Sequence, residues 1–133
     1  MTNTLPTNIR IILAQSILGL KPSGVETLGD ALLAAGLQQS INALPEIITV
    51  KPLNEQYSDA RDTQTNCINT VPLINFSQAL AHHIKPVLQR EEFPIVLGGD
   101  CSILIGILSG VKPIKKIGLL FFDAHADFYQ ASD

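Results

Sequence analysis

The sequence is poor in cysteine, in basic residues and in long hydrophobic runs, and each of these absences excludes a class of protein. Its 133 residues include only two cysteines, Cys67 and Cys101, which gives no disulfide framework and favours a reducing compartment. No apolar run approaches the roughly 20 residues that a membrane-spanning helix requires, so no membrane is expected as a partner. With 9 basic and 12 acidic residues and no basic tract, nucleic acid is not expected as a partner either.

The amino-terminal residues 1–6 also lack the basic and apolar segments of a secretory signal, so we expect a cytoplasmic protein. The length suits one modest domain, which we place over residues 1–133. Apolar residues make up 46% of the chain, which is a high share for a soluble protein. Such an excess is typical of a parallel sheet whose strands are covered by helices on both faces.

Short apolar runs and helical repeats alternate along the chain. Four apolar runs predict strands, at residues 9–14, 46–50, 94–97 and 116–122. Between them, apolar residues recur at helical spacing and predict helices at residues 25–35, 76–87 and 103–108. This alternation is typical of a parallel sheet with right-handed crossovers. The sequence therefore predicts a single α/β domain.

The last apolar run, residues 116–122, is too short for an ordinary helix and predicts a strand buried on both faces of the sheet. It leads directly into Asp123, His125 and Asp127. In extended backbone, side chains at alternate positions point to the same side. Two carboxylates and one imidazole would then converge at the carboxyl end of a strand, where open α/β sheets bind their ligands. This pattern indicates a metal site, although three polar residues bonded to nearby backbone would give the same pattern.

A second motif, residues 98–102 with the sequence Gly-Gly-Asp-Cys-Ser, follows the third predicted strand. It offers Cys101 as a further side chain that can bind a metal. If the two strands are neighbours, Cys101 and the Asp-His-Asp set face one crevice. A phosphate-binding turn is the competing interpretation of Gly98 and Gly99, but the surrounding sequence lacks the G-x-G-x-x-G and G-x-x-x-x-G-K-[ST] patterns.

Three further polar side chains are expected to have no chemical role. Cys67 lies in a polar, aperiodic stretch at residues 54–70, which we expect to be a loop. His82 and His83 are adjacent on a predicted helix, so their side chains point about 100° apart and could not easily share a metal.

The two motifs described above resemble those of a known family. Residues 96–102 followed by residues 122–127 resemble the first two signature motifs of the ureohydrolase family, G-G-D-H-S and D-A-H-x-D. That family includes arginase, agmatinase and formiminoglutamase. Residues 24–26 are also similar to the family's amino-terminal region. The resemblance implies a three-layer α/β/α fold with a mainly parallel sheet, and a hydrolase that cleaves a guanidinium C–N bond to release urea.

The resemblance also implies a cofactor and residue roles. The family holds two Mn²⁺ ions, and a hydroxide between them attacks a small guanidino or formimino substrate. By position, Asp123 would bridge the ions, Asp127 would bind the first, and His125 would bind the second. Asp100 would orient the ligands without binding metal. Cys101 stands where the family usually has a histidine, and a thiolate would favour Zn²⁺ or Fe²⁺; whether it is a ligand stays open.

The family's third motif, S-x-D-x-D, is not found in residues 1–133. We therefore expect the chain to be the amino-terminal portion of one ureohydrolase-like domain, and to be inactive unless another polypeptide completes the site. An uncovered strand edge and apolar surface would favour association with such a completing chain or with further copies of itself. The alternative is a non-catalytic remnant that binds one metal or a partner subunit.

Overall fold

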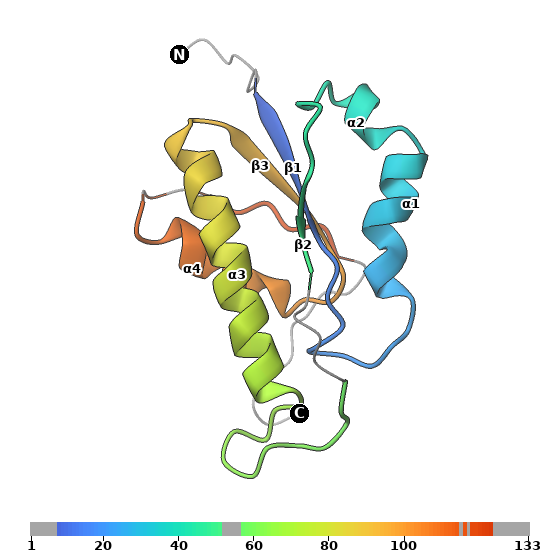
Figure 1. Cartoon of the computed structure of the whole chain (residues 1–133), viewed down its shortest axis with the longest axis vertical. Coiled ribbons are helices and arrows are strands. Elements are labelled where there is room, and N and C mark those ends of the chain that lie inside the picture. Colours follow the sequence, from blue (N-terminus) through green and yellow to red (C-terminus); the bar gives the residue numbers. More distant parts are fainter. Residues whose placement is uncertain (1–7, 52–56, 115, 117, 124–133) are drawn as a thin grey trace.

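The computed structural model describes residues 8–51, 57–114, 116 and 118–123 (Figure 1). Its sheet has three parallel strands in the order β2-β1-β3, so the first strand of the chain lies in the centre. The strands are β1 (Ile9–Ala14), β2 (Ile48–Val50) and β3 (Phe93–Gly98). The prediction of a parallel sheet is confirmed for these strands, although β2 is shorter than its apolar run.

The central strand β1 is buried on both faces because helices cover both sides of the sheet. Successive side chains of a strand point to opposite faces. Accordingly, Ile12 and Ala14 belong to one hydrophobic cluster, while Ile11 and Leu13 belong to another. Ile11 and Ile12 have no exposed surface, which is why residues 11–14 of β1 read as a continuous apolar run in the sequence.

Helices form the outer layers of the structure. On one face, α3 (Thr70–Gln89) and α4 (Ile103–Val111) pack against the cluster that contains Ile12. The other face is covered by α1 (Leu28–Ala34) and α2 (Leu37–Ser40), and a short 3-10 helix (Val25–Thr27) leads into α1. The predicted three-layer α/β/α arrangement is therefore confirmed. Among the helices that the structure describes, none is long and apolar enough to span a bilayer.

The helix α3 begins earlier than the sequence analysis predicts. It starts at Thr70, and its first turns include Val71 and Ile74, which are both largely exposed. Exposed apolar residues give no clear helical face, so the periodic pattern becomes readable only from Phe76 onward. The helix takes only Thr70 from the predicted loop at residues 54–70, and the rest of its earlier start covers residues 71–75.

The prediction of a buried strand at residues 116–122 is wrong for the described part of this segment. Residue 116 and residues 118–123 adopt no regular secondary structure. Leu120 and Phe122 are 77% and 86% exposed. An apolar run becomes a buried strand only where a neighbouring strand accepts its backbone hydrogen bonds and other elements cover its side chains. The described elements supply neither to this segment.

The end of β3 is pressed against the loop that follows β1. A Cβ atom at Gly99 would lie 1.9 Å from the backbone oxygen of Ser16, which is far inside van der Waals contact. At Gly98, in contrast, a Cβ atom would meet only the terminal Cδ1 of Ile103 at 2.1 Å, and that flexible side chain can turn away. Glycine is therefore required sterically at position 99 and only favoured at position 98.

At the opposite, amino end of the sheet, a buried arginine ties the strands together. Arg10 in β1 is 8% exposed. Its Nε and Nη2 atoms donate to the two carboxylate oxygens of Glu92 at 2.9 and 3.1 Å, just before β3. Its Nη1 donates to the carbonyl and carboxylate oxygens of Glu46 at 2.8 and 3.1 Å, just before β2. The hydrogen bonds from Arg10, supported by Arg90, lower the pKa of Glu92 to about 2.

We predict that Glu92→Gln lowers the free energy of unfolding at pH 7 by about 2 kcal/mol, because it leaves the buried guanidinium without its bidentate carboxylate. The pKa of Glu92 is lower in the folded than in the unfolded chain, so its stabilisation is complete above about pH 4.5 and is lost as the pH falls toward 2. Urea denaturation should show the gap between wild type and variant narrowing over that pH range. Glu91→Gln, which removes an exposed neighbouring carboxylate, is the matched control. Equal effects of the two variants would contradict the prediction.

A second prediction concerns the paired glycines. Gly99→Ala should destabilise the fold by about 1–3 kcal/mol, because backbone atoms of Ser16 cannot move without shifting the loop. Gly98→Ala should cost less than about 1 kcal/mol, since only a side-chain terminus must rotate. Thermal or urea unfolding of the two variants checks the order. A larger loss for Gly98→Ala would show that the contact with Ser16 is not the limiting one.

Candidate metal site

The turn between β3 and α4 presents the residues of the first predicted motif. Its backbone amides are already engaged by the end of β1 and the loop after it. The N–H of Gly99 donates to the carbonyl of Ala14 at 3.2 Å, and the N–H of Asp100 donates to the carbonyl of Ser16 at 2.9 Å. A phosphate-binding turn needs such amides to point at the ligand. The structure therefore argues against the phosphate-binding interpretation of the two glycines.

Asp100 points inward and binds backbone donors. It is 6% exposed. Its Oδ1 accepts from the N–H of Ser102 at 2.8 Å, and its Oδ2 accepts from the N–H of Gly19 at 3.2 Å. A buried carboxylate with both oxygens bonded to main chain fixes the path of the turn. This is the arrangement expected of a residue that orients its neighbours, as the sequence analysis assigns to Asp100.

Cys101 and Asp123 come together although they are 22 positions apart. The Sγ of Cys101 donates to Oδ2 of Asp123 at 3.3 Å, and both residues are exposed. The sequence analysis expects this proximity from two neighbouring strands. The structure achieves it through an irregular segment, in which Asp123 does not follow a strand. A thiol and a carboxylate at this distance are two metal-binding groups in one place.

His125 and Asp127 lie outside the described residues, so the predicted convergence with Asp123 stays a prediction. Within the described ranges, no group of three or more His, Cys, Asp and Glu side chains is close enough together to hold a metal ion. The pair of Cys101 and Asp123 is therefore the part of the candidate site that can be assessed. Its two donor atoms fit a divalent cation chemically.

The remaining polar residues of the sequence analysis lie elsewhere. Cys67 is exposed, and its thiol donates to the carbonyl of Thr65 at 3.5 Å. His82 is exposed and His83 is half-buried, with their rings edge to face at 5.9 Å. Within the described residues, neither histidine belongs to a group of three or more His, Cys, Asp and Glu side chains that could hold a metal ion.

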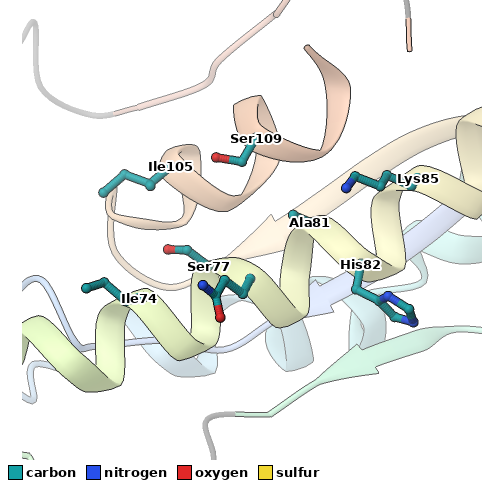
Figure 2. A pocket seen from close by; sticks show the side chains of 8 residues that line it. Ile74, Ser77, Ala81, His82, Lys85, Ile105 and Ser109 are labelled. Atoms are coloured by element: carbon teal, nitrogen blue, oxygen red, sulfur yellow. The ribbon is translucent and has the colours of Figure 1, made fainter. Parts of the chain in front are cut away.

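A shallow groove of about 480 Å³ between α3 and α4 lies apart from the pair of Cys101 and Asp123. Figure 2 shows Ile74 and Ile105 at one end of this groove and Lys85 at the other. None of its lining residues is acidic, and it is open to solvent. The groove therefore offers no carboxylate to bind a metal ion.

The sequence analysis missed Asn69, which is buried beside the candidate site. It is 7% exposed and adopts a left-handed backbone conformation with a φ of 50° just before α3. Its side-chain amide bonds to the loop after β1 and not to the helix that it precedes. Asparagine is common at the position before a helix, and this could have drawn attention to Asn69. That position can be recognised only once the start of α3 at Thr70 is known.

Comparison with known proteins agrees with the fold and with the family resemblance. A family model described as the arginase family matches residues 18–133. An arginase from Bacillus caldovelox is 34% identical over 125 residues, which is 90% of this chain and 41% of that protein. An arginase from Bacillus subtilis strain 168 is 36% identical over 77 residues, which is 57% of this chain and 25% of that protein.

Solved structures show the same relationship. A crystal structure of arginase from Bacillus subtilis strain 168 superposes with a TM-score of 0.66 at 27% identity, over 92% of this chain and 41% of that one. A second arginase structure from Bacillus subtilis gives a TM-score of 0.62 at 23% identity, over 80% of this chain and 34% of that one. The chain thus spans 41% or less of the length of these relatives. With a family model that matches nearly its whole length, the chain belongs to the arginase family.

Proposed function

We propose that this chain carries part of the metal-dependent site of a ureohydrolase, a hydrolase that cleaves a guanidinium C–N bond and releases urea. The observation that carries the proposal is the approach of Cys101 Sγ to Asp123 Oδ2 at 3.3 Å. These two residues come from the two motifs that resemble the family's metal-binding sequences. Their proximity next to the carboxyl end of β3 supports a common site.

The donor set fits a divalent cation. Asp123 supplies carboxylate oxygen, and His125 and Asp127, two and four positions further along, would add imidazole and a second carboxylate. Oxygen and imidazole donors suit Mn²⁺, whereas the thiolate of Cys101 would shift the preference toward Zn²⁺ or Fe²⁺. When bound, a pair of such ions supplies a nucleophile from water at neutral pH and offsets negative charge that develops on the substrate.

In this proposal the chain's own residues have distinct tasks. Asp123 would lie between the two ions, Asp127 would bind the first and His125 the second. Asp100 would hold the turn so that Cys101 faces the same site, because both of its oxygens are bonded to the backbone on either side. The substrate would be a small guanidino or formimino compound in a cytoplasmic enzyme.

We further propose that a segment bearing the S-x-D-x-D motif, which residues 1–133 do not contain, completes this site. The exposed apolar side chains just before Asp123 support a covering partner: Leu119, Leu120, Phe121 and Phe122. Several large apolar side chains exposed together are characteristic of an interface. A second copy of the chain could cover the same surface, and molecular mass in solution would distinguish the two partners.

One observation favours a second candidate function. A thiol at position 101, where the family usually has histidine, suits one soft metal better than a pair of Mn²⁺ ions. The chain would then be a non-catalytic module that binds a single Zn²⁺ or Fe²⁺ or a partner subunit. Metal content after purification separates the two functions.

The proposed function predicts urea release from arginine or agmatine when the chain is mixed with Mn²⁺ and the carboxyl-terminal portion of an arginase. The chain alone should release little or none. Simultaneous replacement of Asp123, His125 and Asp127 by alanine should abolish both cation uptake and urea release. Glu91→Ala, which removes an exposed carboxylate just before β3 at the opposite, amino end of the sheet, is the control. Cation uptake that survives the triple replacement would refute the proposed site.

The role of Cys101 gives a separate prediction. Cys101→His should raise Mn²⁺ affinity by about tenfold or more and reduce the preference for Zn²⁺, because imidazole replaces a soft thiolate. Cys67→His introduces the same side chain at the other exposed cysteine and should change neither affinity. Mn²⁺ titration followed by electron paramagnetic resonance, with Zn²⁺ competition, provides the measurement. Equal behaviour of the two variants would show that Cys101 is not a ligand.

A further inference from the structure

One peptide group in the loop after β1 is held between two buried side chains. The carbonyl of Leu18 accepts from Nδ2 of Asn69 at 3.0 Å, and the N–H of Gly19 donates to Oδ2 of Asp100 at 3.2 Å. These are the two polar groups of the same peptide bond. In a trans peptide they point in opposite directions, so Asn69 and Asp100 lie on opposite sides of the loop. Together they fix the orientation of that peptide plane.

The hydrogen bonds continue beyond both side chains and form a chain. At one end, the N–H of Ser58 donates to Oδ1 of Asn69 at 2.8 Å. At the other end, the N–H of Ser102 donates to Oδ1 of Asp100 at 2.8 Å. From Ser58 to Asp100, every donor points toward the carboxylate. Hydrogen bonds aligned in this way polarise one another, and burial of Asn69 and Asp100 to 7% and 6% exposure strengthens them.

The side chain of Asn69 is available for this chain because it does not cap α3. Asn69 precedes the helix with a φ of 50°, a left-handed conformation that asparagine adopts more readily than most residues, and its side chain makes no capping bond. The loop that it contacts is itself anchored. Leu18 is 3% exposed in the core, and its N–H donates to the hydroxyl of Ser16 at 3.2 Å.

We propose that Asn69 is a positioning residue for the candidate site. It acts through the Leu18–Gly19 peptide on Asp100, and through Asp100 on the turn that bears Cys101. Three segments that meet next to the carboxyl edge of the sheet are thereby joined: the stretch before α3, the loop after β1 and the turn after β3. The chemical purpose of the site is that of the proposed function, but the positioning itself requires no bound metal.

Asn69→Asp tests the proposal because it keeps the size of the side chain, its tolerance of left-handed backbone and the oxygen that accepts from Ser58. It replaces the donor to Leu18 with a second oxygen, which the Leu18 carbonyl repels. Asn66→Asp is the matched control, since Asn66 is exposed, has a φ of 58° and lies in the same loop. Both variants change the net charge equally, so a general electrostatic effect would appear in both.

Amide hydrogen exchange and amide chemical shifts provide the readout. In Asn69→Asp, the Gly19 and Ser102 amides should exchange about tenfold faster than in wild type, and the shifts of Cys101 and Ser102 should move. Neither amide is bonded to Asn69 itself. If Asn69 stabilised only its own loop, the exchange rate of the Ser102 amide would not change. Asn66→Asp should reproduce the wild-type rates and shifts. Unchanged Gly19 and Ser102 amides in Asn69→Asp would overturn the proposal.

Asn69→Gly provides a second variant in case Asn69→Asp does not fold. Glycine accepts a φ of 50° without strain and removes the whole side chain, with Asn66→Gly as its control.

Zn²⁺ and Mn²⁺ titrations connect the result to the site, and cation affinity should fall several-fold in Asn69→Asp and not in Asn66→Asp. Altered amides with unchanged cation affinity would overturn positioning of the site. Failure of wild type to bind either cation would refute the proposed function, while the amide data would still decide the role of Asn69.

Discussion

The close approach of the turn after β3 to the loop after β1 is the constraint on which the candidate site depends. Parallel pairing of the two strands brings their carboxyl ends side by side. Gly99 then allows the turn to press against Ser16, and two of the turn's amides donate to β1 or its loop. Cys101 follows within two residues of this contact, so its location is determined by backbone packing before any metal chemistry is considered.

The two ends of the sheet are secured by different kinds of polar interaction. At the amino end, the charge on Arg10 is neutralised by Glu92 and Glu46, and the three strands are held by one ion-pair cluster. At the carboxyl end, Asp100 and Asn69 bond mainly to backbone groups, so their charge and dipoles fix loops. The ion-pair cluster opposite the site and the hydrogen-bonded loops at the site together hold the backbone, so an exposed residue such as Cys101 keeps its place without being buried.

Much of this arrangement could be predicted from the sequence, because it depends on local periodicity. The strand at Ile9–Ala14 and the helix at Ile103–Val111 both follow from apolar spacing, and the parallel order follows from their alternation. Residues 116–122 could not be placed in this way, since burial depends on which elements cover an apolar run. Asn69 was missed for a related reason: its partners at Ser58 and Leu18 are 11 and 51 positions away, and no local pattern reports contacts at such separations.

The position of Asp123 links metal binding to partner binding in the proposed site. Asp123 directly follows the exposed residues Leu120 and Phe122, so whatever covers those side chains also restricts where its carboxylate can lie. A cation held between Asp123 and Cys101 would conversely restrict the apolar segment and prepare it for its partner. Because coupling between two binding events is reciprocal, each should strengthen the other. The exposed apolar side chains and the proposed metal ligand Asp123 thus belong to one structural feature, the irregular segment over residues 118–123.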